Sequence, residues 1–218
     1  MRSDREVPYG SLVLVPGLVT LGVTLLRLTG ERLGWSRALF NPEPGGGGAP
    51  VGIVWLIFIF GFWFGYKLTV LGHPPSRAGK ALGFAFAAIA VMAAVIVGFN
   101  ALKLSFGLSL VLIGIASVAG IAIAWRGWPE LAKTLLIYGF VARLPVAAVA
   151  LVAMLGDWKT HYDAAPPELP PMGVWPRFFL TGLLPQMTIW IYMTVVVGII
   201  FGVIAYAVAG KRAVATAS

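Results

Sequence analysis

The sequence contains no cysteine and only two histidines among its 218 residues. The absence of thiols excludes disulfides, thiol catalysis and quinone-linked dithiol exchange. The two histidines, His73 and His161, fall in different connecting segments, on opposite faces of the topology derived below. They are therefore not expected to share a metal or to ligate haem together, and zinc sites built from several His or Cys ligands are excluded. We expect no metal and no cofactor.

Charged residues are also scarce. They make up 11% of the chain, whereas hydrophobic residues make up 59% and the mean hydropathy is +0.91. A soluble globular chain carries roughly 25% charged residues, so this composition is typical of a membrane protein. No segment between apolar runs exceeds about 30 residues, and an independent domain needs roughly 50. We expect one membrane domain over residues 1–218, with no separate soluble domain.

Six apolar runs are long enough to form membrane-spanning helices, which need about 20 residues. Their predicted boundaries are 9–26, 51–71, 81–102, 107–125, 134–155 and 185–209. A helix satisfies its own backbone hydrogen bonds where water is absent, and the alternation of a barrel strand is missing. Runs 81–102 and 107–125 are rich in alanine and glycine, so we expect them to form the tightly packed centre. The predicted fold is an all-α, six-helix transmembrane bundle.

The last apolar run begins at Phe178 and is too long for one ordinary span. A helix from Phe178 to Ala209 would measure about 48 Å at 1.5 Å per residue. Pro185 lacks the amide that would continue the hydrogen-bond ladder, so we place the break there. The stretch VWPRFFLTGLL, residues 174–184, is then expected to lie at the interface as a short helix before the last span.

The distribution of basic residues predicts the orientation. With six spans both termini share one face, which carries nine Lys and Arg residues against six on the opposite face. The positive-inside rule then predicts a multi-pass protein of the plasma (inner) membrane with both termini in the cytoplasm. The first span is expected to be an uncleaved anchor, because no small-x-small cleavage site follows it.

The formal net charge of +8 is spread in ones and twos over connecting segments on both faces. This pattern excludes the continuous basic stripe that a nucleic acid would need. Membrane lipids, including anionic headgroups, and other membrane subunits are the expected partners.

All eight acidic residues fall outside the predicted spans, so we expect no buried carboxylate. A proton- or sodium-coupled carrier usually keeps an acidic side chain near the bilayer midplane. The commonest chemistry for ion coupling therefore has no candidate residue in the predicted spans.

One polar segment carries residue types that are used in catalysis. Asp157 and His161 are four apart, so one further helical turn would place them on one face, and Asp163 follows. A carboxylate beside a histidine raises the basicity of the imidazole. The favoured interpretation is a hydrated loop that ends in a stiff, proline-rich connector. The tetraglycine at 45–48 is expected to be a flexible external linker, since it lacks the lysine of a phosphate-binding loop.

Arg143 stands nine residues into the span 134–155. A charge near the midplane costs from about 3 to more than 10 kcal/mol, and Arg143 lies too deep to reach the interface. It is therefore expected to face the bundle interior, where its possible partners include Asn100, Gln186 and the carbonyl freed by Pro145. Two interpretations stay open: a structural hydrogen-bond hub, or a site for a carboxylate, a phosphate or a lipid headgroup.

These observations favour a non-enzymatic inner-membrane protein, either a small permease or a subunit of a membrane complex. Arg143 is its polar centre, and Arg143, Asn100 and Gln186 are the candidate substrate-binding residues.

The alternative is a membrane-embedded enzyme that acts on a lipid or isoprenoid at the outer interface. Its candidate catalytic residues are Asp157, His161 and Asp163. The acids in HYDAAPPE are poorly spaced for the magnesium that prenyl-phosphate chemistry generally requires.

Overall fold

The computed structural model describes residues 6–167 and 169–215, and every regular element in these two ranges is a helix. The predicted all-α class is therefore confirmed for the described part of the chain. The long helices are α1 (Tyr9–Arg32), α2 (Leu56–Val70), α3 (Ala78–Ala101), α4 (Phe106–Trp125), α5 (Pro129–Gly156) and α8 (Ile189–Ala215). The short helical segments are η1 (Pro44–Gly48), α6 (Val174–Arg177), η2 (Phe178–Leu183) and α7 (Leu184–Met187).

Five helical segments of the described ranges are long and apolar enough to cross a membrane. They are α1, α3, α4, α5 and the composite segment Val174–Ala209. α2 has only 15 residues, which corresponds to about 22 Å and falls short of a hydrocarbon core of roughly 30 Å. The structure thus fits a membrane protein with five candidate spans, and a sixth crossing by α2 stays a prediction.

α1 and α5 are longer than the apolar runs that predicted them. α1 continues six residues past the predicted end at 26, through Arg32. α5 begins at Pro129, five residues before the predicted start at 134. Proline is well suited to the first position of a helix, because its missing amide has no intrahelical partner there. Both helices therefore carry polar residues beyond their apolar cores.

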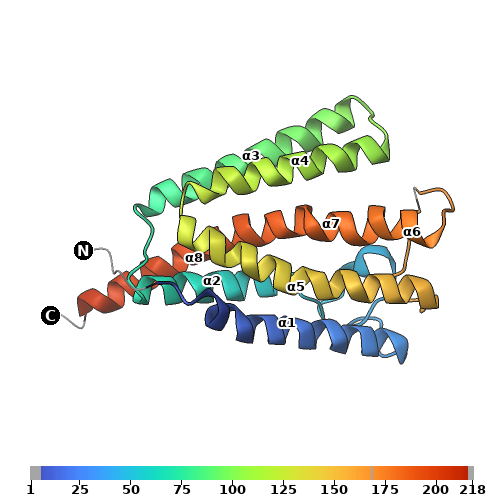
Figure 1. Cartoon of the computed structure of the whole chain (residues 1–218), viewed down its shortest axis with the longest axis horizontal. Helices are drawn as coiled ribbons and strands as arrows, with labels where there is room; N and C mark the ends of the chain where they lie inside the picture. Colours follow the sequence, from blue (N-terminus) through green and yellow to red (C-terminus); the bar gives the residue numbers. More distant parts are fainter. Residues whose placement is uncertain (1–5, 168, 216–218) are drawn as a thin grey trace.

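The predicted break at Pro185 takes a different form in the structure. α6, η2, α7 and α8 follow one another along one nearly continuous helical path, and Val174–Ala209 forms a single candidate span of 36 residues (Figure 1). η2 is a π-helical turn directly before α7, which contains Pro185, and the backbone leaves helical geometry at Thr188, with φ −115° and ψ −86°. Prolines and π-turns are the usual causes of helix kinks. A separate interfacial helix stays a prediction.

α8 lies at the centre of the bundle, so the expectation that α3 and α4 form the centre is wrong. Each segment has a most apolar stretch of 18 residues. In Val174–Ala209, 56% of this stretch is buried inside the protein, compared with 17% in α3 and 22% in α4. α8 contacts α2, α3, α4 and α5, while α3 and α4 form a hairpin along one side (Figure 1).

The close approach of α2 to α8 depends on facing glycines. A Cβ added to Gly61 would lie 2.7 Å from the Gly198 Cα, and Gly65 faces Gly202 in the same way. Small residues allow such backbone contact in a membrane, where lipid supplies no hydrophobic drive for helix association. The small residues that allow a close helix contact at the centre of the bundle therefore lie on α2 and α8.

Successive helices reverse direction, so the connections gather at two ends of the bundle (Figure 1). One end holds the α1–α2 connection, which includes η1, together with the α3–α4 and α5–α6 connections. We call this the loop-rich end. The candidate site lies between the helices towards this end.

Candidate functional site

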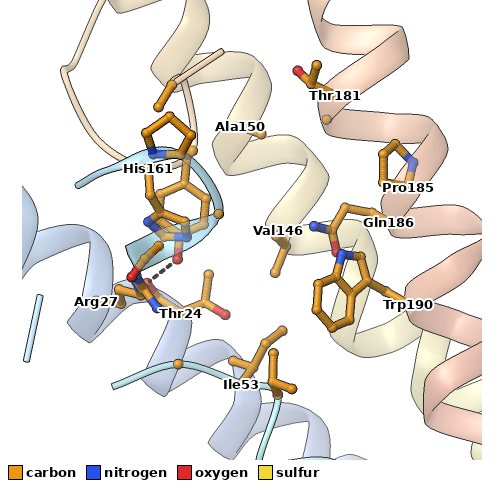
Figure 2. Close-up of a pocket in the computed structure, with 18 of the residues that line it drawn as sticks. Thr24, Arg27, Ile53, Val146, Ala150, His161, Thr181, Pro185, Gln186 and Trp190 are labelled. Atoms are coloured by element: carbon orange, nitrogen blue, oxygen red, sulfur yellow. Dashed lines mark hydrogen bonds between the residues drawn. The ribbon is translucent and has the colours of Figure 1, made fainter. Parts of the chain in front are cut away.

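A cavity of about 530 Å³ lies between α1, α5, the α1–α2 connection and the segment from η2 to α8. Figure 2 shows His161 and Arg27 on one side, Gln186 and Trp190 on the other, and Val146 and Ala150 of α5 between the two sides. The volume is within the roughly 300–1,000 Å³ of pockets that hold small organic molecules. The cavity is therefore large enough for a ligand.

Arg143 lines this cavity from the middle of α5, and only 3% of its surface is exposed. Its Nη1 lies 3.4 Å from the Oε1 of Gln186, which is a long hydrogen bond. Its guanidinium carbon lies 4.7 Å from the ring centroid of Trp190, in cation–π contact. Its Nε is buried without a hydrogen-bond acceptor. In the described part of the chain, no acidic side chain forms an ion pair with Arg143.

The structure brings together two of the three predicted substrate-binding residues. Arg143 and Gln186 meet at the cavity, and the hydrogen bond of Arg143 goes to this amide. Asn100 lies apart from them, exposed in the last turn of α3, where it donates to the carbonyl of Ile96 at 2.9 Å. Sequence reasoning missed Trp190, which lies four residues beyond Gln186 and contacts the guanidinium of Arg143 with its ring.

Arg27 is a second buried arginine of the cavity wall, and all three of its nitrogens have acceptors. Nε donates to the Glu31 Oε1 at 2.8 Å. The two Nη atoms donate at 2.8–3.2 Å to three backbone carbonyls of the α1–α2 connection, those of Val51, Asn41 and Gly46. Arg27 therefore fastens this connection to the last turns of α1.

The tetraglycine forms part of the 3₁₀ helix η1 and not the flexible linker that the sequence predicts. Gly46 is buried and has φ +77°, and a Cβ at this position would collide with the Nη2 of Arg27. Glycine is required here because it accepts positive φ and leaves room for the guanidinium.

Glu31 is the carboxylate partner of His161. Its side chain is fully buried, and its two oxygens lie 2.7 and 2.8 Å from the Nδ1 of His161. Its Oε2 also accepts the backbone amide of His161 at 2.9 Å. The expectation that no carboxylate is buried is therefore wrong. α1 continues past its apolar run, and Arg27, one turn earlier, compensates the charge of Glu31.

The imidazole of His161 is neutral near pH 7 in this setting. Burial lowers its pKa by more than the Glu31 carboxylate raises it. Nδ1 then carries the proton and donates to Glu31. Sequence reasoning missed Glu31 as this partner, although Arg27 and Glu31 stand four apart at the end of an apolar run, the spacing of a helical ion pair.

The other two candidate catalytic residues do not converge with His161 on one point. Asp157 is exposed and pairs with Lys159 at 2.7 Å. Asp163 accepts the amide and the hydroxyl of Thr160, both at 2.7 Å, and so folds the turn that carries His161. Of the three residues, only His161 lines the cavity.

The cavity combines charged, polar and apolar groups. It presents one cation with unused donors, a neutral imidazole and apolar walls. Within residues 6–167 and 169–215, no group of three or more His, Asp or Glu side chains is placed to hold a metal ion. The chain matches no protein-family model, no curated protein and no solved structure.

Proposed function

We propose that this chain is a non-enzymatic, multi-pass membrane protein that binds an anionic ligand at Arg143, as a small permease or as a subunit of a membrane complex. The observation that carries the proposal is a buried guanidinium that lines a cavity and has an unpaired Nε. An unpaired buried charge costs several kcal/mol, and an anion in the cavity would compensate it through charge-assisted hydrogen bonds. Arg27, in the same cavity wall, instead uses all three of its nitrogens within the protein.

The alternative is an enzyme that acts on a lipid or isoprenoid at the outer interface. It would require Asp157, His161 and Asp163 to act together on one substrate. The contacts of Asp157 with Lys159, and of Asp163 with the turn at Thr160, favour structural roles for both carboxylates. These contacts support the binding function over the enzyme.

We also propose six membrane crossings, a plasma (inner) membrane location, both termini in the cytoplasm and an interfacial position for residues 174–184. The reversal of direction from helix to helix and the nine-to-six distribution of basic residues support this placement. The loop-rich end then faces outwards. Cysteines introduced at Ser36 and Ser76, both exposed and at opposite ends, test it. Labelling of Ser36→Cys only from the cytoplasm would contradict the orientation.

The binding function is tested by thermal unfolding of the purified protein in a nonionic detergent, with a panel of carboxylates and phosphates. At least one anion should stabilise the wild type but not Arg143→Gln. Arg126→Gln removes the same charge at an exposed turn at the other end of the bundle and should behave like the wild type. If Arg143→Gln and Arg143→Lys lose folded protein equally and no anion stabilises the wild type, Arg143 is a structural hub and the proposal fails.

A permease and a complex subunit differ in a further measurement. A permease should move the stabilising anion across proteoliposomes that contain this chain alone. A subunit should bind the anion without flux and should co-purify with other membrane proteins.

A further inference from the structure

The charges of the cavity wall narrow the class of ligand. Resting on the proposed binding function at Arg143, we infer that the site takes a monocarboxylate with an apolar body, in preference to a phosphate or another dianion. Three properties of the cavity carry this inference: its net charge, the donors that remain on Arg143, and its apolar walls.

The cavity wall carries one uncompensated positive charge, that of Arg143. Arg27 also lines the cavity, but Glu31 balances it at 2.8 Å. His161 adds no charge near neutral pH, because burial lowers its pKa. Tyr162 is neutral as well, because burial raises the pKa of its hydroxyl. One negative charge therefore balances the cavity, and a dianion would leave a second charge unpaired in apolar surroundings.

The donors that remain on Arg143 match a carboxylate. Trp190 covers one face of the guanidinium, and Gln186 contacts Nη1. Within the described residues, neither Nε nor Nη2 donates to another group, and Nε is buried. Adjacent Nε–H and Nη2–H donors form the fork that contacts both oxygens of a carboxylate. A phosphate would bring a third oxygen and a second charge for which the wall has no further cation.

The rest of the wall fits an apolar body. Val146 and Ala150 lie between the His161 side and the Trp190 side of the cavity (Figure 2). Val23, Ile53 and Pro185 also line it. A cavity of about 530 Å³ is far larger than a carboxylate group alone. An apolar body attached to the carboxylate would therefore cover these walls and exclude water from around the ion pair.

Isothermal titration calorimetry in a nonionic detergent at pH 7.5 tests the inference with probes of defined charge. Phenylacetate and octanoate are the monocarboxylates, phenylacetamide is the neutral counterpart, phenyl phosphate is the dianion, and acetate lacks the apolar body. We expect phenylacetate or octanoate to bind at least about tenfold more tightly than the other three probes. Phenylacetamide lacks the charge-assisted hydrogen bonds, acetate lacks the apolar contact area, and phenyl phosphate brings a second charge that the wall does not pair.

Variants connect this binding to Arg143. Arg143→Gln should weaken monocarboxylate binding at least about tenfold, whereas Arg126→Gln should bind as the wild type does. Arg143→Lys keeps the positive charge but lacks the two adjacent donors, so its affinity for the monocarboxylate should lie between those of the other two variants. If Arg143→Gln does not fold, Arg143→Lys still tests the fork, and unchanged affinity in this variant would overturn bidentate binding.

The outcomes separate the inference from the function on which it rests. If phenyl phosphate binds through Arg143 as tightly as phenylacetate or more tightly, the inferred preference for a monocarboxylate is wrong, while the proposed anion binding stands. If none of the anions binds, or if Arg143→Gln binds them unchanged, both the inference and the proposed function are wrong.

Discussion

Arg27 on α1 and Arg143 on α5 line the same cavity, and both are buried. They differ in the number of hydrogen-bond partners that the protein provides. Arg27 makes four hydrogen bonds, one of them to the carboxylate of Glu31. Arg143 makes one long hydrogen bond and stacks on Trp190. The difference teaches that two arginines buried in one cavity wall can have quite different numbers of protein partners. It is the unused donors of Arg143, and not its burial, on which the proposed binding function rests.

The largest expected effect comes from removing each arginine in turn. Arg27→Met leaves the buried charge of Glu31 without its ion-pair partner, which should lower the free energy of unfolding by about 3–5 kcal/mol. Arg143→Met removes a charge without an acidic partner and should leave the stability of the ligand-free protein equal or higher. Denaturant unfolding in detergent measures both. Equal losses would remove the distinction between the two arginines.

A double variant serves as the control for the Arg27 result. Replacing Arg27 and Glu31 together, as Arg27→Met with Glu31→Leu, removes both charges and should recover a large part of the lost stability. A loss equal to the sum of the two single losses would indicate that the pair itself contributes little.

A smaller loss of stability is expected from substitutions in the tetraglycine, which Arg27 contacts through Gly46. Gly45 and Gly46 both have positive φ, of 69° and 77°, but only a Cβ on Gly46 would meet Arg27. Gly45→Ala should cost about 1–2 kcal/mol for the backbone alone, and Gly46→Ala about 1 kcal/mol more, because Arg27 must also shift. Thermal unfolding of the two variants side by side measures the difference. Equal costs would show that the guanidinium is not held there.

The protonation of His161 tests whether its imidazole adds a charge to the Arg27 side of the cavity. Because burial lowers the folded-state pKa of His161, the unfolded chain binds the proton more readily below its ordinary pKa of about 6.5. Stability should therefore fall as the pH decreases below about 6.5, by at most about 1.4 kcal/mol per pH unit. His161→Asn cannot titrate and should show a flatter profile. Identical pH profiles for the two proteins would contradict a neutral, buried imidazole.

The smallest expected effect concerns the ring that Arg143 stacks on. Trp190→Leu removes the cation–π contact and should weaken phenylacetate binding about two- to fivefold, whereas Trp190→Phe should keep part of it. Calorimetry measures both affinities. Unchanged affinity in Trp190→Leu would show that Gln186 alone positions the guanidinium.

The sequence predicted the helices well where a helix coincides with an apolar run. α3 and α4 begin within three residues of their predicted starts, because length and hydropathy alone define them. The inward position of Arg143 was predictable as well, from its depth in a span and its small neighbours, and the structure confirms that it is buried. These features depend on local composition, which the sequence contains directly.

The contacts of the polar side chains and the positions of the helices in the bundle could not be predicted in the same way. α3 is apolar almost all round, so the sequence does not indicate which side of it faces the bundle, and Asn100 lies on the exposed side. Glu31 and His161 are 130 residues apart, and only the packing of α1 against α5 brings them together. The glycines of α2 and α8 reveal a close contact only once the two helices are known to pair.

Glu31 joins two separate parts of the loop-rich end. One carboxylate anchors two connections that are far apart in the chain: the α1–α2 connection through Arg27, and the α5–α6 connection through His161. Loss of this carboxylate would therefore weaken the attachment of both connections to α1 together. The contacts from Arg32 to the Trp158 carbonyl and from the Tyr162 hydroxyl to the Thr24 carbonyl would remain.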